Sequence, residues 1–288
     1  MRWNILYRGP LSSCNYGCNY CPFAKTKNSR AELQDDARKL QRFVDWVAQQ
    51  DAEIGILFTP WGEAMIRRHY QRAFVELSRM EHVAKVAIQT NLTFPTQWIA
   101  ECNRERIAFW TTFHPTQTTL PKFLRKCAEL DALAVRYSVG VVGFGDALPL
   151  ARELRAKLPD HVYLWANAYK RDPNYYSDDD ITAWEEIDPL FRFNTRYHPA
   201  RGRPCEAGFS SFTVDGEGDV RRCHFIKDVL GNIYQHDIVT RLSRQNCVND
   251  TCGCHIGYVH MPELGLYEVF GDGLLERIPS TMAQAMQS

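Results

Sequence analysis

Short apolar runs alternate with amphipathic stretches over the first 170 residues of the chain. Several of these runs are apolar on both faces and rich in Val, Ile, Phe, Trp and Tyr, which is typical of parallel strands covered by helices. We therefore expect six strands, at Asn4–Arg8, Ile54–Thr59, Val83–Asn91, Ile107–His114, Ala134–Gly143 and Val162–Tyr169.

The segments between these runs have the periodicity of helices. Ser29 and Glu32 form a capping box at the start of a helix. The apolar face of that helix is expected to contain Leu33, Leu40, Phe43, Val44 and Val47. Further helices are expected at Ala64–Met80, Pro95–Cys102, Pro121–Leu130, Leu148–Leu158 and Ile181–Leu190. This alternation predicts an α/β fold in which six βα units form a partial (β/α)6 barrel, since a complete barrel has eight.

The pattern changes near residue 200. Cysteines, glycines and short β-like pieces replace the alternation, and Phe209–Arg222 is expected to form a hairpin around Asp215 and Gly216. We predict a partial barrel over residues 1–200, a small cysteine-rich domain over 201–262, and a helical tail over 263–288.

Charge and hydrophobicity exclude some functions. The 34 Lys and Arg residues balance the 34 Asp and Glu residues, so we expect neither nucleic acid nor an anionic membrane as a partner. No apolar run approaches the roughly 18 residues of a membrane span, and the start MRWNILYRGP lacks the apolar region of a signal peptide. These features predict a cytoplasmic protein whose ten cysteines stay reduced. Two of them, Cys102 and Cys127, are expected to be ordinary core residues.

Three cysteines follow the first expected strand with the spacing Cys14-x3-Cys18-x2-Cys21. In a β/α barrel this loop lies at the catalytic face. Three thiolates can bind three irons of a 4Fe–4S cubane and leave the fourth iron open. Structural zinc normally needs a fourth ligand, and none is nearby in the sequence. The spacing therefore favours an iron–sulfur cluster with one open coordination position.

The segment Cys14-Asn-Tyr-Gly-Cys18-Asn-Tyr20-Cys21 resembles the C-x3-C-x-aromatic-C signature of the radical S-adenosylmethionine (SAM) superfamily. The resemblance implies that SAM binds the open iron and is reductively cleaved to a 5′-deoxyadenosyl radical, which abstracts a substrate hydrogen. It extends to strand ends, where Pro60-Trp61-Gly62-Glu63 is similar to the Gly-Gly-Glu segment of that family. The SAM contacts that the resemblance implies are Tyr20, Gly62, Glu63, Asn91, Thr112, His114, Ser138 and Val142.

Five further cysteines lie in the last third of the chain, namely Cys205, Cys223, Cys247, Cys252 and Cys254. Since a cubane takes four ligands, the spacing leaves open which cysteine is spare, and it also leaves open a zinc knuckle. The run Cys205-x12-Gly218-x4-Cys223 resembles the auxiliary-cluster region called SPASM, or its shorter form called twitch. That resemblance implies a second 4Fe–4S cluster in the 201–262 domain.

The resemblance implies several possible reactions. An auxiliary cluster that accepts an electron favours an oxidative or post-translational modification, or the dehydrogenation of a sugar or aminocyclitol. A redox-neutral epimerase would use the spare cysteine as a hydrogen donor, and the third possibility is a non-enzymatic iron–sulfur or zinc protein. The substrate is expected to be a peptide or a small polar metabolite, and the reductant a flavodoxin or ferredoxin.

Two other sequence features bear on function. The first strand begins at Asn4, which leaves no room for a leader-peptide-binding module and argues against a ribosomal peptide. Three histidines lie near the late cysteines, at His224, His255 and His260, and are expected to be surface residues or hydrogen-bonded structural residues.

Overall fold

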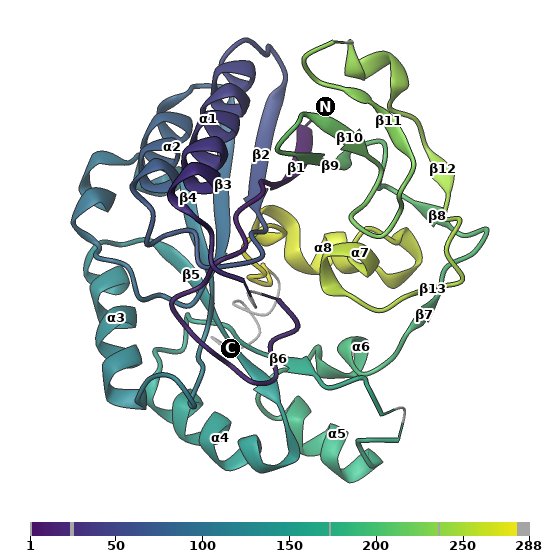
Figure 1. Ribbon diagram of the computed structural model, residues 1–288. Helices are drawn as coiled ribbons and strands as arrows, with labels where there is room; N and C mark the ends of the chain where they lie inside the picture. Colours follow the sequence, from purple (N-terminus) through teal and green to yellow (C-terminus); the bar gives the residue numbers. More distant parts are fainter. Residues whose placement is uncertain (1, 24–25, 173, 236, 281–288) are drawn as a thin grey trace.

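The computed structural model describes residues 2–23, 26–172, 174–235 and 237–280. Its main feature is one nine-stranded sheet with the order β11-β10-β9-β1-β2-β3-β4-β5-β6. The sheet curves around a central space, and α1 to α5 cover its outer side (Figure 1). The first six strands run parallel and are β1 Arg2–Arg8, β2 Glu53–Phe58, β3 Val83–Thr90, β4 Ile107–Thr112, β5 Arg136–Gly143 and β6 Leu164–Ala168.

All six expected strands are present, and their ends differ from the expected ones by at most two residues. The capping box is also confirmed, because the Ser29 side chain accepts from the Glu32 N–H while Glu32 accepts from the Ser29 N–H. The helices on the outer side are α1 Arg30–Val47, α2 Arg68–Arg79, α3 Leu120–Ala132, α4 Leu148–Lys157, α5 Asp178–Glu185 and the short α6 Phe191–Asn194.

Three helix predictions are wrong in extent. The expected helix at Pro95–Cys102 is a single 3₁₀ turn, Gln97–Glu101, because a segment this short makes too few helical hydrogen bonds to offset nucleation. The α2 helix begins at Arg68 rather than Ala64, since residues 64–67 form a turn after Glu63. The α5 helix begins after Ser177, whose side chain caps it, and ends at Glu185.

The two faces of the sheet are filled differently. The outer face packs on the helices through a large apolar core that includes Ile5, Tyr7, Phe58, Phe74 and Phe109. The inner face carries a smaller cluster, which the C-terminal segment completes with Ile256 and Leu275; its sheet residues are Leu6, Leu57, Ala87, Ala108, Trp110 and Trp165. Since side chains alternate along a strand, β1, β2, β3, β4 and β6 supply residues to both layers.

The C-terminal part of the chain continues this sheet. The predicted hairpin is confirmed as β9 Ser211–Asp215 and β10 Asp219–Arg221, and β9 pairs in parallel with β1. Because β11 Val229–Asn232 pairs with β10, the sheet crosses the expected boundary at residue 200 without interruption. Two small antiparallel pairs follow, formed by β7 His198–Pro199 with β13 Thr251–Cys252 and by β8 Pro204–Cys205 with β12 Gln245–Asn246.

The last described residues close one end of the barrel. The helices here are short, α7 His255–Tyr258 and α8 Leu266–Phe270, and the end of the predicted tail, residues 281–288, lies outside the described residues. Glu276 reaches the inner face of the sheet, where its carboxylate pairs with Lys85 and Arg136. Among the described helices, none has the length and hydrophobicity that a membrane span requires.

Candidate functional site

The loop with Cys14, Cys18 and Cys21 follows β1, at the end of the barrel opposite Glu276. Cys18 is buried, and the other two thiols are partly exposed. The Tyr16 N–H donates to the Cys14 Sγ (3.3 Å), and the Cys21 N–H donates to the Cys18 carbonyl (3.3 Å). Burial raises the pKa of Cys14 and of Cys18, so a bound cation is needed to hold both as thiolates at neutral pH.

Neighbouring loops fix the start of this segment. The Asn28 side-chain oxygen accepts from the N–H groups of Ser12 (2.9 Å) and Ser13 (2.8 Å). The Ser13 carbonyl in turn accepts from the Glu63 N–H (3.1 Å). Gly62 lies so close to Ser13 that a Cβ atom at position 62 would overlap the Ser13 carbonyl. Gly62 therefore has a packing role that sequence reasoning missed, because only the tertiary structure shows the approach.

Glu63 joins the ends of β2 and β3. Its carboxylate is 2 % exposed and accepts hydrogen bonds from the Asn91 N–H (2.6 Å) and the Thr90 hydroxyl (2.8 Å). It also accepts from the Met65 N–H (3.0 Å). Burial raises the pKa of Glu63 to about 7, while these hydrogen bonds oppose the shift. In this arrangement Glu63 holds Asn91, whose side-chain amide lies 3.8 Å from the Cys14 Sγ.

Tyr20 and His114 connect the cysteine loop to the end of β4. The Tyr20 hydroxyl and the His114 Nδ1 are 2.9 Å apart, and their rings are stacked at 5.9 Å. Burial lowers the pKa of His114 to about 4, so the imidazole is neutral at pH 7. A second tie is the Gly17 N–H, which donates to the Gln117 side chain (2.9 Å). The loop is thus held from both β3 and β4.

A solvent-open cleft adjoins this loop and includes two of the expected SAM contacts, Tyr20 and Val142. Thr112 ends β4 and is half-buried. Ser138 is in a different environment, because it is fully buried and its hydroxyl donates to the Glu276 carbonyl (2.6 Å). The other residues of the cleft are Asn19, Pro115, Thr116, Val141, Phe144, Asp146, Ala147, Leu150, Tyr169, Arg171 and Tyr175.

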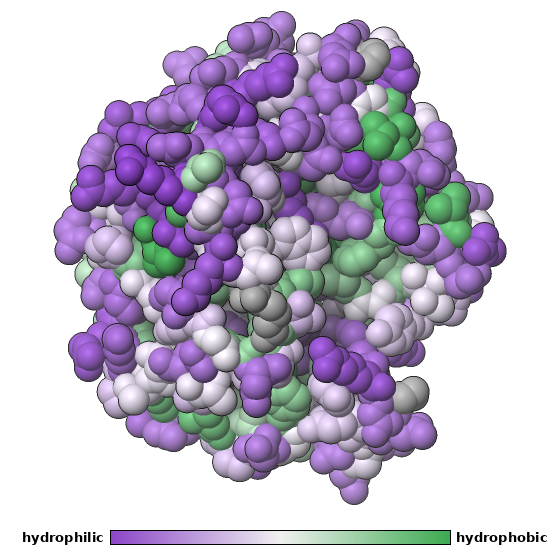
Figure 2. Space-filling model, in the orientation of Figure 1, coloured by the Kyte–Doolittle hydropathy of each residue, from purple (hydrophilic) through white to green (hydrophobic). Residues whose placement is uncertain are grey.

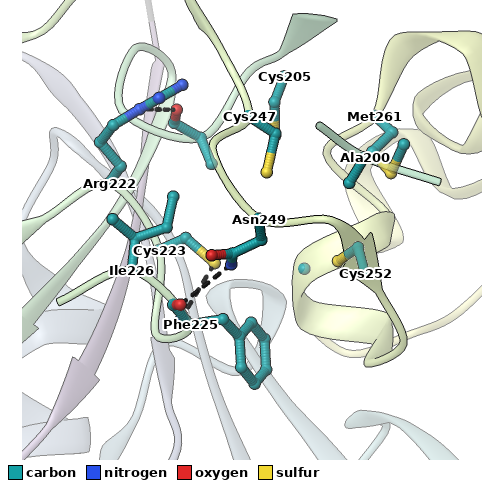
Figure 3. A pocket seen from close by; sticks show the side chains of 12 residues that line it. Ala200, Cys205, Arg222, Cys223, Phe225, Ile226, Cys247, Asn249, Cys252 and Met261 are labelled. Carbon is teal, nitrogen blue, oxygen red and sulfur yellow. Dashed lines mark hydrogen bonds between the residues drawn. The ribbon is translucent and has the colours of Figure 1, made fainter. Parts of the chain in front are cut away.

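Four of the five late cysteines line one cavity. Figure 3 shows Cys223 and Cys252 on opposite sides of this space, with Cys205 and Cys247 near each other on a third side. Cys254 is not among the lining residues of this cavity.

The cavity lined by these four thiols is suited to a positively charged ligand. Burial, together with a smaller effect of the neighbouring thiols, raises the pKa of Cys223 and of Cys252 to about 12. Four thiolates on one cavity are stable together only when positive charge compensates them. Arg222 stiffens the wall by donating to the Asn246 (2.9 Å) and Gln245 (2.6 Å) carbonyls. In the described part of the chain, no three Cys, His, Asp or Glu side chains converge closely enough to hold a single metal ion.

Solved structures provide a comparison for this fold. "Native anSMEcpe with bound AdoMet" aligns over 83% of this chain and 83% of that chain, with a TM-score of 0.54 and 15% identity. This chain has the fold of anSMEcpe. The complex "Native anSMEcpe with bound AdoMet and Cp18Cys peptide" aligns over 99% of this chain and 100% of that chain, with a TM-score of 0.54 and 14% identity. No protein-family profile and no curated protein sequence matches the chain.

anSMEcpe is a radical SAM enzyme that matures sulfatases, and AdoMet is another abbreviation for SAM. Its fold has a large parallel sheet with helices, as this chain does. The cysteine loop after β1 and the four-cysteine cavity therefore lie in a fold that carries SAM in anSMEcpe.

The three histidines near the late cysteines have separate environments. His224 Nε2 lies 2.9 Å from the Thr59 hydroxyl, and His260 contacts the Ser211 (3.2 Å) and Tyr267 (2.7 Å) hydroxyls. The prediction of hydrogen-bonded structural histidines is confirmed for these two. His255 is buried with its ring edge-on to Trp110 (5.4 Å), and its Nε2 has no hydrogen-bond partner among the described residues.

Proposed function

We propose that this protein is a radical SAM enzyme in which Cys14, Cys18 and Cys21 hold a 4Fe–4S cluster with one open iron for SAM. Reductive cleavage of SAM at that cluster supplies a 5′-deoxyadenosyl radical, which removes a hydrogen atom from the substrate. The observation that carries this proposal is the C-x3-C-x2-C loop at the carboxyl end of the first strand, in a fold shared with anSMEcpe.

The surrounding residues have roles in binding and positioning. Gly62 packs closely on the cysteine loop, and Glu63 holds Asn91, whose amide lies next to Cys14. These contacts keep the three thiols in position. The aromatic and aliphatic walls of the cleft, including Tyr20 and Val142, suit the adenosine part of SAM. Thr112 and the neutral His114 supply polar groups at the same edge of the sheet.

We assign a second 4Fe–4S cluster to Cys205, Cys223, Cys247 and Cys252. The four cysteines that line this cavity match the four irons of a cubane, which takes one thiolate at each iron. Four protein ligands leave no open iron for a substrate, so this cluster would serve to accept the electron of the substrate radical. The net reaction is then an oxidation, with a flavodoxin or ferredoxin as the external reductant.

The experiment is anaerobic reconstitution with iron counting and a SAM-cleavage assay. The wild-type protein is expected to bind about eight irons, four for each cubane. Alanine at any of Cys14, Cys18 or Cys21 should leave about four irons and abolish cleavage. Alanine at Cys223 should also leave about four irons but retain cleavage, while the control Cys127→Ala keeps about eight. One zinc ion with about four irons would contradict the second cluster, and cleavage that survives Cys18→Ala would contradict the whole proposal.

The substrate is proposed to be a peptide or a small polar metabolite. Deuterium transfer from labelled candidates of each kind into 5′-deoxyadenosine, read by mass spectrometry, decides between them. A label from neither kind of candidate would contradict this choice of substrate. We propose that the protein acts in the cytoplasm, with no membrane or nucleic acid partner.

A specific observation favours a second candidate reaction, an epimerisation. Cys254 is exposed and lies outside the four-cysteine cavity, so its thiol is available as the spare hydrogen donor. It would give a hydrogen atom to the substrate radical, and the remaining thiyl radical would take one electron and one proton with the same external reductant. In D2O, the epimerase would place solvent deuterium in the product, and Cys254→Ala would stop product formation while 5′-deoxyadenosine is still formed. Product without solvent deuterium would support the oxidation instead.

A further inference from the structure

Four buried side chains lie together on the inner side of the barrel. Trp110 is on β4, Trp165 is on β6, His255 begins α7, and Arg277 belongs to the last described segment. We call these four residues the Arg277 cluster, and each of them is between 2 % and 6 % exposed. Figure 1 shows α7 inside the curve of the sheet, and Figure 2 shows this face of the molecule hollowed near its centre.

Direct ring contacts join the members of the Arg277 cluster. The Trp110 ring centroid is 5.6 Å from that of Trp165 and 5.4 Å from that of His255, and both pairs meet edge-on. The Arg277 Cζ lies 4.6 Å from the Trp165 ring centroid and 5.9 Å from that of Trp110. Since the other three members all contact Trp110, their polar atoms lie in one small region.

Each member has a nitrogen without a hydrogen-bond partner in the described part of the chain. The four atoms are the Nε1 of Trp110, the Nε1 of Trp165, the Nε2 of His255 and the Nε of Arg277. Leaving a buried N–H group unbonded costs stability, so nearly all such groups in proteins have a partner. Four unbonded nitrogens in one set of touching side chains therefore indicate a site that a hydrogen-bond acceptor completes.

The backbone around Arg277 is strained and tightly held. Arg277 has a φ of 53°, in the left-handed region that residues other than glycine seldom adopt, and such strain is concentrated at binding and active sites. Before it, the Glu276 carbonyl accepts from the Ser138 hydroxyl (2.6 Å). After it, Gly273 is so close to Ile278 that a Cβ atom at position 273 would overlap the Ile278 carbonyl. The segment thus fixes this guanidinium inside the barrel.

Asp188 leaves the hydrogen-bonding capacity of Arg277 unused. Its Oδ2 is 3.9 Å from the Arg277 Nη2, which is too long for a hydrogen bond. The Asp188 carboxylate already accepts from the N–H groups of Ala166 (2.9 Å) and Leu190 (3.0 Å) and from the Tyr163 hydroxyl. Asp188 therefore balances the charge of Arg277 from a distance, and a ligand can still accept hydrogen bonds from the guanidinium.

We propose that the Arg277 cluster binds a carboxylate group of the substrate. Guanidinium and indole N–H groups donate hydrogen bonds and cannot accept them, so the ligand must present acceptor oxygens. Among such groups, a carboxylate matches the planar fork of a guanidinium with two oxygens. This inference rests on the proposed function for the identity of the occupant, and it narrows the substrate to a molecule that carries a carboxylate.

The Arg277 cluster also lies near the position proposed for SAM. Trp110 and Thr112 are two residues apart on β4, so their side chains point to the same face of the sheet about 7 Å from each other. Thr112 ends the strand at the edge where the proposed function places SAM. A carboxylate held at Trp110 would therefore place the adjoining carbon atoms toward the 5′-deoxyadenosyl radical.

The test measures acetate binding to the reconstituted protein by titration calorimetry, with SAM already bound. The wild type should bind acetate, and it should bind the neutral isostere acetamide about tenfold more weakly. Arg277→Met should weaken acetate binding by about tenfold or more, and Trp165→Phe, which keeps a ring but removes the N–H, by about threefold. The matched control is Trp98→Phe, which removes an unpartnered indole N–H from the outer core and should bind acetate as the wild type does.

Three outcomes would overturn the site. The first is that the wild type binds no acetate, or that Arg277→Met and Trp165→Phe bind it as tightly as the wild type. The second is that acetate binds only when SAM is absent, because the cluster would then serve the carboxylate of SAM. The third is tighter binding of inorganic phosphate than of acetate, which would exclude the carboxylate as the preferred group.

Iron content separates loss of binding from loss of folding. Trp165→Phe and Trp98→Phe lose the same side-chain volume and should both keep about eight irons. If Arg277→Met loses its irons, the comparison of these two variants decides, and equal acetate affinities would overturn the site. Acetate binding needs no turnover, so it can fail while the iron count and SAM cleavage of the proposed function succeed, and the reverse also holds.

Discussion

The Lys85–Glu276 ion pair at the closed end of the barrel allows a quantitative prediction about the free energy of unfolding. Glu276 is 0% exposed, and its Oε2 has no hydrogen-bond partner in the described part of the chain, so Oε1 carries both Lys85 and Arg136 (2.9 Å). Lys85→Met keeps the length of the side chain and leaves the carboxylate with Arg136, whose side chain is 45% exposed. Removing one partner of a buried pair leaves a desolvated charge and costs about 3–5 kcal/mol.

Urea denaturation of the cluster-free protein, followed by tryptophan fluorescence, measures this loss as a lower midpoint at unchanged slope. Arg136→Met is the matched control and should cost about 1 kcal/mol or less, because its guanidinium is exposed. The double variant Lys85→Met/Glu276→Leu removes both charges and should recover most of the stability. The reasoning is refuted if Lys85→Met costs no more than Arg136→Met, or if the double variant is less stable than Lys85→Met alone.

Three further predictions concern the site. Gly62→Ala should displace the Ser13 carbonyl and lose about four irons, whereas Gly17→Ala, where the added methyl meets open space, should keep them; equal iron contents would contradict the packing role. The pKa of Glu63 is raised from 4.5 to about 7, so its contribution to stability is full below pH 4.5 and falls by about 3 kcal/mol as the pH rises from 4.5 through 7. Glu63→Gln should remove that part of the pH dependence in urea midpoints, and an unchanged wild-type profile would argue against it. Ser138→Ala should cost about 1–3 kcal/mol by leaving the Glu276 carbonyl unpaired, with no change in SAM affinity; weaker SAM binding would return Ser138 to the SAM site.

Local sequence signals determined most of the α/β part. The capping box at Ser29 and the apolar runs depend on neighbours a few residues apart, so the strands and α1 were predictable. The 3₁₀ turn at Gln97–Glu101 was not, because periodicity over so few residues does not distinguish a helix from a turn. The pairing of β9 with β1 was also hidden, since it joins strands about two hundred residues apart.

Some features of the candidate site were likewise predictable from the sequence, and others were not. The spacing of Cys14, Cys18 and Cys21 lies within eight residues, so the sequence alone determined that three thiols share one loop after the first strand. The sequence likewise predicted that the hairpin brings Cys205 and Cys223 toward one cluster. It gave no signal for Asn28, which fixes the loop through backbone N–H groups.

Only the tertiary structure decided which late cysteines share a cavity and which one lies outside it. Cys252 and Cys254 are two residues apart, and the chain turns between them from β13 into α7. The physical reason is that spacing constrains only groups joined by a short stretch of backbone, whereas cavities and unpaired charges arise where the sheet curves and distant segments pack together.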